Sequence, residues 1–240
     1  MRNWDKRWWW AIGIFTILLI WDQGVKWYVK THFQYGEVEI LWPGWLNIQF
    51  VENPGMAFGW MLPGQMGKLL LTVFRIGVFI GITIYLYRLI QRKANTALIA
   101  CMALILAGAL GNILDSVFYG VIFDKGAVYD EHYMDYMPYA DLAVPNGAGY
   151  APWLMGNVVD MIHVCKYIHF PEWVPVVGGQ VRPLFPPIFN IADSAISVGI
   201  VLLLLFQKRF FAEEDLKSAK EEEKPNDAET NLEATSEVSE

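Results

Sequence analysis

Four long apolar runs divide the chain, and each is close to the ~20 residues that an α-helix needs to cross a bilayer. They cover approximately residues 8–29, 69–89, 97–117 and 188–206. Lys and Arg gather at the N-terminus, between the second and third runs, and after the fourth run. The positive-inside rule therefore predicts four membrane-spanning helices with both ends of the chain in the cytoplasm.

Two segments are then expected outside the membrane, and they differ in pattern. Residues 38–60 alternate partly between apolar and polar positions and contain turn signals, which indicates short strands near the membrane interface. Residues 119–187 form a long external loop, rich in Tyr, Pro and Gly, that exceeds the usual length of a passive connection. The predicted class is an all-α membrane protein with a small external β element.

Composition agrees with a membrane protein, because 55% of the 240 residues are hydrophobic and mean hydropathy is +0.29. The net charge of -7 comes from residues 212–240, which contain 11 acidic and 3 basic side chains. We expect a transmembrane domain over residues 1–211 and a disordered acidic cytoplasmic tail over residues 212–240. The first apolar run is interpreted as a retained span, since no small-residue cleavage site follows it.

Each of the four runs carries a polar side chain in the part expected to form the outer third of the bilayer. A carboxylate such as Asp193 inside a span costs about 3 kcal/mol on insertion scales, so such groups normally face the bundle interior and find partners. The polar residues of the other runs are Asp22, Arg75, Asn112 and Asp115. The sequence predicts that these residues meet near the outer face.

A purely structural role remains open for most of them. Asp22 and Lys26 have the i,i+4 spacing of an ion pair. Arg75 can extend its charge to the outer interface. Asn112 and Asp115 can hydrogen-bond between helices.

Asp160 has apolar neighbours in a segment that could return to the membrane, but its local pattern predicts only a solvated loop acid. A second carboxylate beside Asp193 would nevertheless have a chemical use. Two adjacent carboxyl groups share one proton at neutral pH. The charged one can take a proton from water while the other donates to a substrate carbonyl, which hydrolyses a peptide bond without metal or cofactor.

Five motifs, in order along residues 8–208, resemble those of the lipoprotein signal peptidases (signal peptidase II), a family of bacterial membrane aspartic proteases. They are DQGVK at 22–26, NPGMAFG at 53–59, GALGNILD at 108–115, VVDMI at 158–162 and FNIADS at 189–194.

The resemblance implies four transmembrane helices with an external β-cradle in the bacterial inner membrane. The implied substrate is a prolipoprotein whose Cys carries diacylglyceryl, cut just before that Cys near the outer, periplasmic face by a dyad of Asp160 and Asp193. The residues with implied positioning or supporting roles are Asn53, Asn112, Asn190, Asp115, Asp22 and Lys26. We expect a monomer in contact with membrane lipid, with no metal, cofactor or nucleic-acid partner.

The chain departs from the family pattern in two places. Ser116 follows Asp115 where the family has Arg, and we hypothesise that Arg75 substitutes for it. Residues 119–156 are longer than the usual connection, and they fit a lid, a partner site or added cradle surface equally well. An alternative function is a proton-coupled transporter that uses Asp22, Asp115 and Asp193, although the sequence has no internal repeat.

Overall fold

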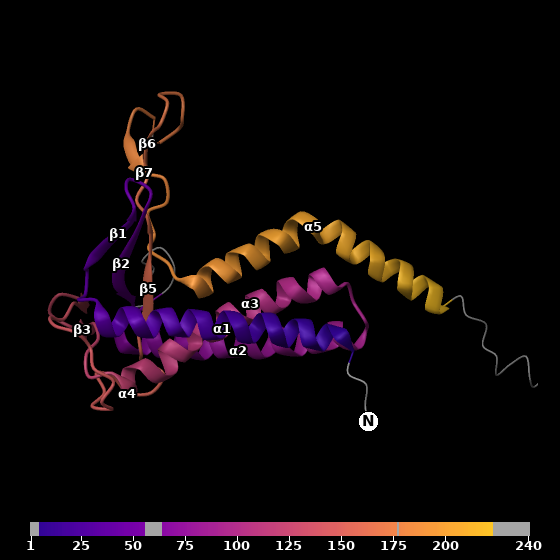
Figure 1. The fold of residues 1–240 in the computed structure, drawn as a ribbon, viewed down its shortest axis with the longest axis horizontal. Helices are drawn as coiled ribbons and strands as arrows, with labels where there is room; N and C mark the ends of the chain where they lie inside the picture. Colours follow the sequence, from indigo (N-terminus) through magenta and orange to yellow (C-terminus); the bar gives the residue numbers. More distant parts are fainter. Residues whose placement is uncertain (1–4, 56–63, 177, 223–240) are drawn as a thin grey trace, which may run out of the picture.

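The computed structural model describes residues 5–55, 64–176 and 178–222 (Figure 1). Four long helices dominate it: α1 (Lys6–His32), α2 (Gly64–Gln91), α3 (Thr96–Leu114) and α5 (Ile191–Glu222). All four are long and apolar enough to cross a membrane, which confirms the four predicted spans. The start of α1, the turn from α2 to α3 and the C-terminal end of α5 lie at one end of the helices, and the strands lie at the other.

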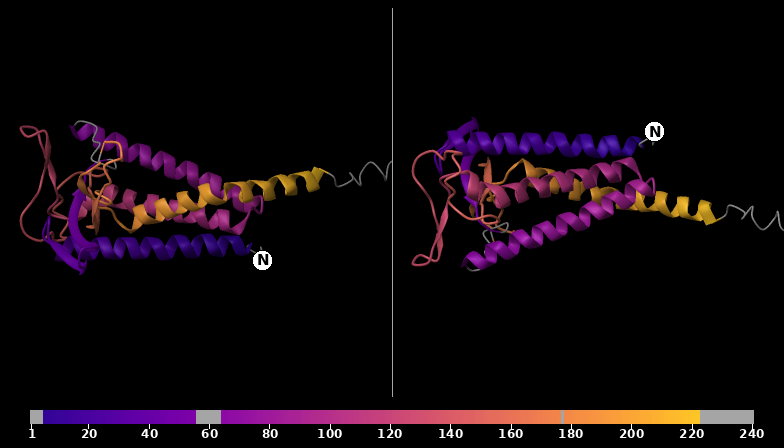
Figure 2. Two further views of the ribbon diagram at one scale, coloured as in Figure 1. Left: turned by 90° about the horizontal axis from the view of Figure 1, so that it is seen from above. Right: turned by 90° about the horizontal axis from the view of Figure 1, so that it is seen from below.

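Helix α3 is the centre of the bundle, and it packs against α1, α2 and α5 (Figure 2). Two glycines allow this close approach. A Cβ on Gly108 would lie 2.3 Å from the backbone oxygen of Ala192 in α5, and a Cβ on Gly111 would lie 2.5 Å from Oδ2 of Asp22 in α1. Small residues at a membrane helix interface permit such contacts between backbones.

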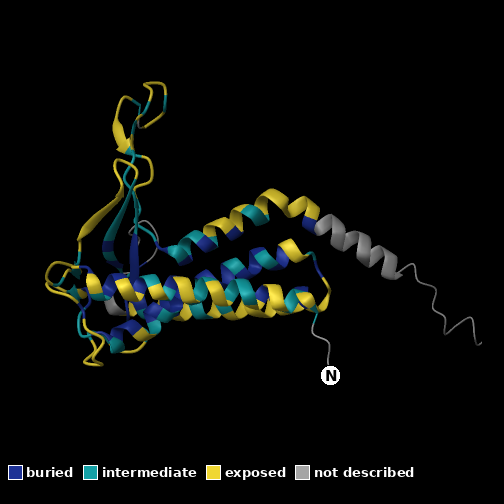
Figure 3. Ribbon diagram, in the orientation of Figure 1, coloured by how far each residue is buried: buried dark blue, intermediate teal, exposed yellow. Residues whose placement is uncertain are grey.

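Apolar side chains cover the outward faces of the other three helices, along which Figure 3 shows exposed residues alternating with half-buried and buried ones. Examples are Ile17 and Ile20 on α1, Phe74 on α2, and Leu204 and Leu205 on α5. In water these faces would be unfavourable, whereas the hydrocarbon of a bilayer solvates them.

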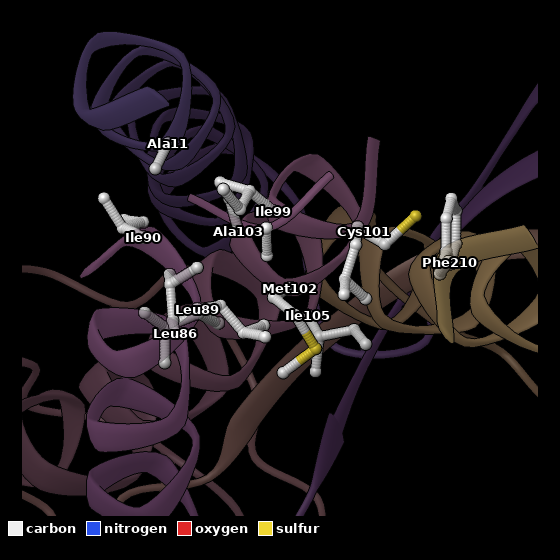
Figure 4. Close-up of a cluster of buried hydrophobic side chains, with 13 residues drawn as sticks. Ala11, Leu86, Leu89, Ile90, Ile99, Cys101, Met102, Ala103, Ile105 and Phe210 are labelled. Carbon is white, nitrogen blue, oxygen red and sulfur yellow. The ribbon is translucent and has the colours of Figure 1, made fainter. Parts of the chain in front are cut away.

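An apolar core joins all four helices at the end away from the strands (Figure 4). Leu86 and Ile90 of α2 pack with Ile99 and Met102 of α3, and Phe210 of α5 belongs to the same cluster. The Asp, Glu, Lys and Arg side chains of these helices lie at the ends of the bundle and in its outer half.

A three-stranded antiparallel sheet caps the other end in the order β1 (Val38–Trp42), β2 (Leu46–Asn53) and β5 (Val158–Val164). The strands expected within residues 38–60 are thus confirmed up to Asn53, and residues 56–60 lie outside the described part of the chain. Strand β5 joins from far along the sequence, pairing Val51 with Asp160 and Asn53 with Val158.

The long outer segment contains further short elements. A π-helix, η2 (Asp115–Tyr119), and one helical turn, α4 (Gly120–Ile122), continue α3, so the third span stays helical beyond Leu114. Two hairpins follow, β3 (Val128–Asp130) with β4 (Asp135–Met137), and β6 (Tyr167–His169) with β7 (Val181–Pro183).

The first part of this segment packs on the sheet. Phe123 and Ala143 are buried with Phe50 of β2 and Val159 of β5 in a second apolar cluster. This part of residues 119–156 is therefore packed on the sheet, as expected for added cradle surface, one of the three roles left open by the sequence.

Helix α5 begins at Ile191, three residues later than predicted. The preceding Phe189 is extended instead, because its backbone forms an antiparallel bridge with Ile162 of β5. Asp193 consequently lies in the first turn of α5 rather than well inside a span. At its other end α5 continues to Glu222, past the predicted boundary at residue 211, and residues 223–240 of the expected tail lie outside the described residues.

Candidate active site

Asp160 lies in the middle of β5 and is only 2% exposed, so the solvated loop position suggested by its local pattern is wrong. The error arose because β5 pairs with a strand more than 100 residues earlier in the chain. Two side-chain amides hydrogen-bond its carboxylate: Nδ2 of Asn53 donates to Oδ2 over 3.1 Å, and Nδ2 of Asn190 donates to Oδ1 over 2.6 Å.

Asp193 is held by the start of α5. Its backbone N–H donates to Oδ1 of Asn190 over 2.9 Å, and the backbone N–H of Asn190 donates to Oδ2 of Asp193 over 3.3 Å. This reciprocal arrangement is that of a capping box, which fixes the side chains of the first helical turn. Nδ2 of Asn112 on α3 donates to the other oxygen, Oδ1 of Asp193, over 2.8 Å.

The two carboxylates are connected through these amides. Nδ2 of Asn190 lies 3.1 Å from Oδ1 of Asn112, so a continuous path of hydrogen bonds runs from Asp160 to Asp193. Both acids also line one cavity of about 570 Å³, together with Asn53. We call this space the dyad cavity; its other lining residues include Arg75, Asn112, Val158, Phe185, Ser197 and Val198.

Burial, and next the nearby charge of Asp193, raise the pKa of Asp160 to about 8. The hydrogen bond from Asn53 and the more distant charge of Lys26 act in the opposite direction. The pair therefore retains one proton at neutral pH, which is the state that acid–base catalysis by two carboxyl groups requires.

Lys26 lies behind these acids, fully buried in α1. Its Nζ is 2.9 Å from Oδ2 of Asp22 and 2.9 Å from Oδ2 of Asp115, and it donates to Oδ1 of Asn112 over 2.9 Å. The predicted i,i+4 pair of Asp22 and Lys26 is thus present, but it is part of a larger cluster. Through Asn112 this cluster sets the position of the amide that binds Asp193.

The two supporting acids also fix backbone groups. Oδ1 of Asp22 accepts the N–H of Ala192 in α5 over 2.8 Å. Oδ2 of Asp115 accepts the N–H of Val159 in β5 over 3.2 Å. Asp22 and Asp115 therefore tie down the residues that immediately precede Asp193 and Asp160 in the sequence.

Sequence reasoning missed Gln23. Its Nε2 donates to Oδ1 of Asp115 over 2.9 Å and to the carbonyl of Gly111 over 3.1 Å, while its Oε1 accepts from the hydroxyl of Tyr119 over 3.3 Å. The available signal was an uncharged amide beside Asp22 within an apolar run.

Arg75 does not reach out to the interface. Its Nη2 donates to the carbonyl of Gly55 over 3.1 Å, and its Nη1 lies 3.5 Å from Oγ of Ser116. It is partly buried and lines the dyad cavity. The guanidinium of Arg75 thus contacts the residue that follows Asp115.

A second buried polar cluster is separate from the one around Lys26, and it was not found by the sequence analysis. Glu52 pairs with Lys30 and accepts hydrogen bonds from the hydroxyl of Tyr139 over 2.9 Å, the backbone of Ala127 over 2.8 Å and Nδ2 of Asn157 over 2.7 Å. Lys68 of α2 also donates to Asn157. We call this the Glu52 cluster; it joins α1, β2 and α2 to the outer segment.

Two further cavities adjoin the site. One, of about 510 Å³, has almost entirely apolar walls and lies between α1, the sheet and α5. It shares Ser194 and Val198 with the dyad cavity. The other, of about 600 Å³, lies on the strand side of Asp160. Within the described residues no three His, Cys, Asp or Glu side chains are grouped as metal ligands.

The sequence matches known proteins over most of its length. A family profile described as "Signal peptidase (SPase) II" matches residues 14–209. A lipoprotein signal peptidase of Porphyromonas gingivalis (strain ATCC 33277) is 42% identical over 201 residues, covering 82% of each chain. One from Amoebophilus asiaticus (strain 5a2) is 32% identical over 205 residues, covering 83% of this chain and 78% of the relative.

The fold also has a solved counterpart. A structure described as a "bacterial membrane enzyme" at 1.9 Å resolution has a TM-score of 0.51 and 26% sequence identity. The similarity covers 81% of this chain and 90% of that one.

Proposed function

The chain belongs to the signal peptidase II family, and from this premise we propose that it is an aspartic endopeptidase that acts within the membrane on prolipoproteins. As a family member it is a peptidase and a multi-pass bacterial membrane protein. The proposed substrate carries diacylglyceryl on its Cys, and the proposed cut falls just before that Cys. The alternative of a proton-coupled transporter has no support from the family.

The observation that carries this proposal is the pair Asp160 and Asp193, which line one cavity and are connected by amide hydrogen bonds. In the proposed reaction the charged carboxylate takes a proton from water as the water oxygen attacks the scissile carbonyl carbon. The neutral carboxyl donates its proton to the carbonyl oxygen. When the C–N bond breaks, the carboxyl that took a proton from water passes it to the nitrogen of the lipidated Cys. A hydroxyl of the tetrahedral intermediate gives its proton to the other carboxylate as the new carboxyl group forms, so the dyad again holds one proton.

The positions of the helices agree with a cut near one membrane surface. The dyad lies where the four spans meet the sheet, at the end opposite to the start of α1. Under the predicted topology that end faces the periplasm, and both chain ends face the cytoplasm. The scissile bond at the outer end of a membrane-embedded signal peptide would lie at this depth.

The apolar cavity suits the lipid part of the substrate. It adjoins the dyad cavity through Ser194 and Val198, and its walls are almost entirely apolar. An acyl chain in this cavity could remain attached to a Cys near the dyad. Arg75, held by Gly55 and Ser116, is proposed to substitute for the missing family Arg in binding polar groups of the substrate.

The full-length protein in lipid vesicles tests the assignment. Wild type should cleave a diacylglyceryl prolipoprotein but not the unmodified precursor, whereas Asp160→Asn and Asp193→Asn should abolish cleavage. The matched control is Asp141→Asn, because Asp141 is an exposed acid of the outer segment and should be dispensable. Full cleavage by either dyad variant would refute the proposal, and thermal unfolding should show that both variants remain folded.

A further inference from the structure

The cavity of about 600 Å³ on the strand side of Asp160, which we call the outer cavity, is not used by the chemistry proposed above. Besides Asp160 of β5 and Tyr35, its walls come from three parts of the chain that are distant in sequence. Strand β2 contributes residues 51–53, hairpin β3–β4 contributes Asp135 and Tyr136, and the segment before α5 contributes residues 186–188. The hairpin belongs to residues 119–156, the stretch that exceeds the usual family connection.

The outer cavity meets the dyad cavity at Asp160, since both are lined by Asp160, Asn53, Pro187 and Ile188. Apart from these shared residues, the two spaces are lined by different parts of the fold. The dyad cavity reaches Ser197 and Val198, about one turn further into α5 than Asp193, whereas the outer cavity is an open hollow lined by strands and loops. A polypeptide cut at Asp160 would therefore have its two halves on different sides of it.

The walls of the outer cavity are fixed in place. Nζ of Lys68 lies 5.1 Å from the centre of the Tyr136 ring, and Tyr129 packs against the same ring with the centroids 5.4 Å apart. Glu52 binds Ala127 and Tyr139 on either side of the hairpin, so the hairpin is tied to β2. This anchorage is that of a built subsite rather than of a lid that swings freely.

The adjoining end of β2 is suited to an extended chain. Strand β1 pairs with β2 only up to Gln49, and Phe50 bonds to Gly36 and Glu37. Among the strands that the structure describes, residues 51–53 pair with β5 alone. An extended peptide can lie along such a strand end and place alternate side chains in neighbouring pockets.

We propose that the outer cavity is a binding subsite for the first polar residues of the mature lipoprotein, those that follow the lipidated Cys. This inference rests on the proposed function, because it needs the scissile bond at Asp160. The signal peptide then occupies the membrane side of the site, and the mature segment leaves between β2 and the hairpin. Tyr136 is the specificity residue that this chain has added on its outer segment.

The test compares two synthetic substrates with the same signal peptide and the same diacylglyceryl Cys. The short one ends at that Cys as a carboxamide, and the long one continues for five polar residues. Tyr136→Ala should lower kcat/KM for the long substrate about tenfold, as expected for loss of a central aromatic contact, and leave the short substrate within about twofold. Tyr136→Phe keeps the ring and should resemble wild type on both.

The matched control is Tyr133→Ala, which removes an exposed tyrosine of the same hairpin that does not line the outer cavity. It should change neither substrate. Equal effects of Tyr136→Ala on both substrates, or no effect on either, would overturn the subsite while leaving the peptidase function intact. Failure of wild type to cleave either substrate would instead refute the proposed function.

A second measurement does not depend on whether Tyr136→Ala folds. A photoreactive benzophenone side chain placed two residues after the Cys of the long substrate should crosslink to the hairpin of wild type. Crosslinks found only on segments that do not line the outer cavity would overturn the proposal.

Discussion

Replacing Lys26 by Met should destabilise the protein more than the same replacement of any exposed lysine. The side chains of Lys26, Asp22 and Asp115 are at most 3% exposed, so neither acid can regain water when the ammonium is removed. Met retains most of the aliphatic volume of Lys. The change therefore removes the charge and its hydrogen bonds while the packing of α1 against α3 is largely kept.

The expected loss is about 3–5 kcal/mol in the free energy of unfolding, the usual effect of leaving a buried charge without its partner. This loss of stability should be smaller than the sum for two independent ion pairs, because each acid keeps other hydrogen-bond donors. Asp22 retains Ala192 and Gln23, and Asp115 retains Gln23 and Val159. Asn112 also loses the ammonium that orients it, so cleavage should fall together with stability.

Unfolding in a detergent titration measures the effect, with Lys6→Met as the control because Lys6 is exposed at the start of the same helix. The control should stay within about 0.5 kcal/mol of wild type. The triple variant Asp22→Asn, Lys26→Met, Asp115→Asn should recover part of the lost stability, since it no longer buries a carboxylate. A loss below 1 kcal/mol in Lys26→Met, or no recovery in the triple variant, would refute the reasoning.

Three further predictions concern catalysis and packing. Cleavage should fall as pH rises through about 8, because the dyad loses its proton at the raised pKa of Asp160. The hydrogen bond from Asn53 lowers this pKa, so Asn53→Leu should move the alkaline limb of the kcat profile to higher pH. Gly108→Ala should lower the free energy of unfolding by about 1–3 kcal/mol because its Cβ would strike the α5 backbone, whereas Gly77→Ala, with nothing within 4 Å, should be nearly neutral in the same denaturation assay. Arg75→Ala should raise KM strongly and Arg75→Lys less so; near-normal cleavage in both would exclude its proposed substitute role.

Much of the helical architecture could be predicted because it depends on local pattern. Span length and flanking charge are properties of single segments, and the common depth of Asp22, Arg75, Asn112 and Asp193 followed from counting residues along each span. The structure places these four residues around one site.

Non-local contacts account for what could not be predicted. Asp160 acquires its burial only when β5 pairs with β2, and its local sequence gives no sign of that partner. Helix α5 begins at Ile191 because Phe189 bonds to β5 instead of to its own helix. In the Glu52 cluster, Glu52 and Asn157 are 105 positions apart, so periodicity carries no information about their contact.

Two layers of charge explain how the same end of the bundle can hold four buried or partly buried aspartates. In the inner layer, Lys26 compensates Asp22 and Asp115 directly. In the outer layer, the described groups that hydrogen-bond Asp160 and Asp193 are side-chain amides and a backbone N–H, all of them uncharged. Uncharged donors orient a carboxylate without neutralising it. The repulsion between Asp160 and Asp193 is therefore relieved by a proton bound to one of them. A lysine in direct contact with the dyad would favour two charged carboxylates and remove the acid that the reaction needs.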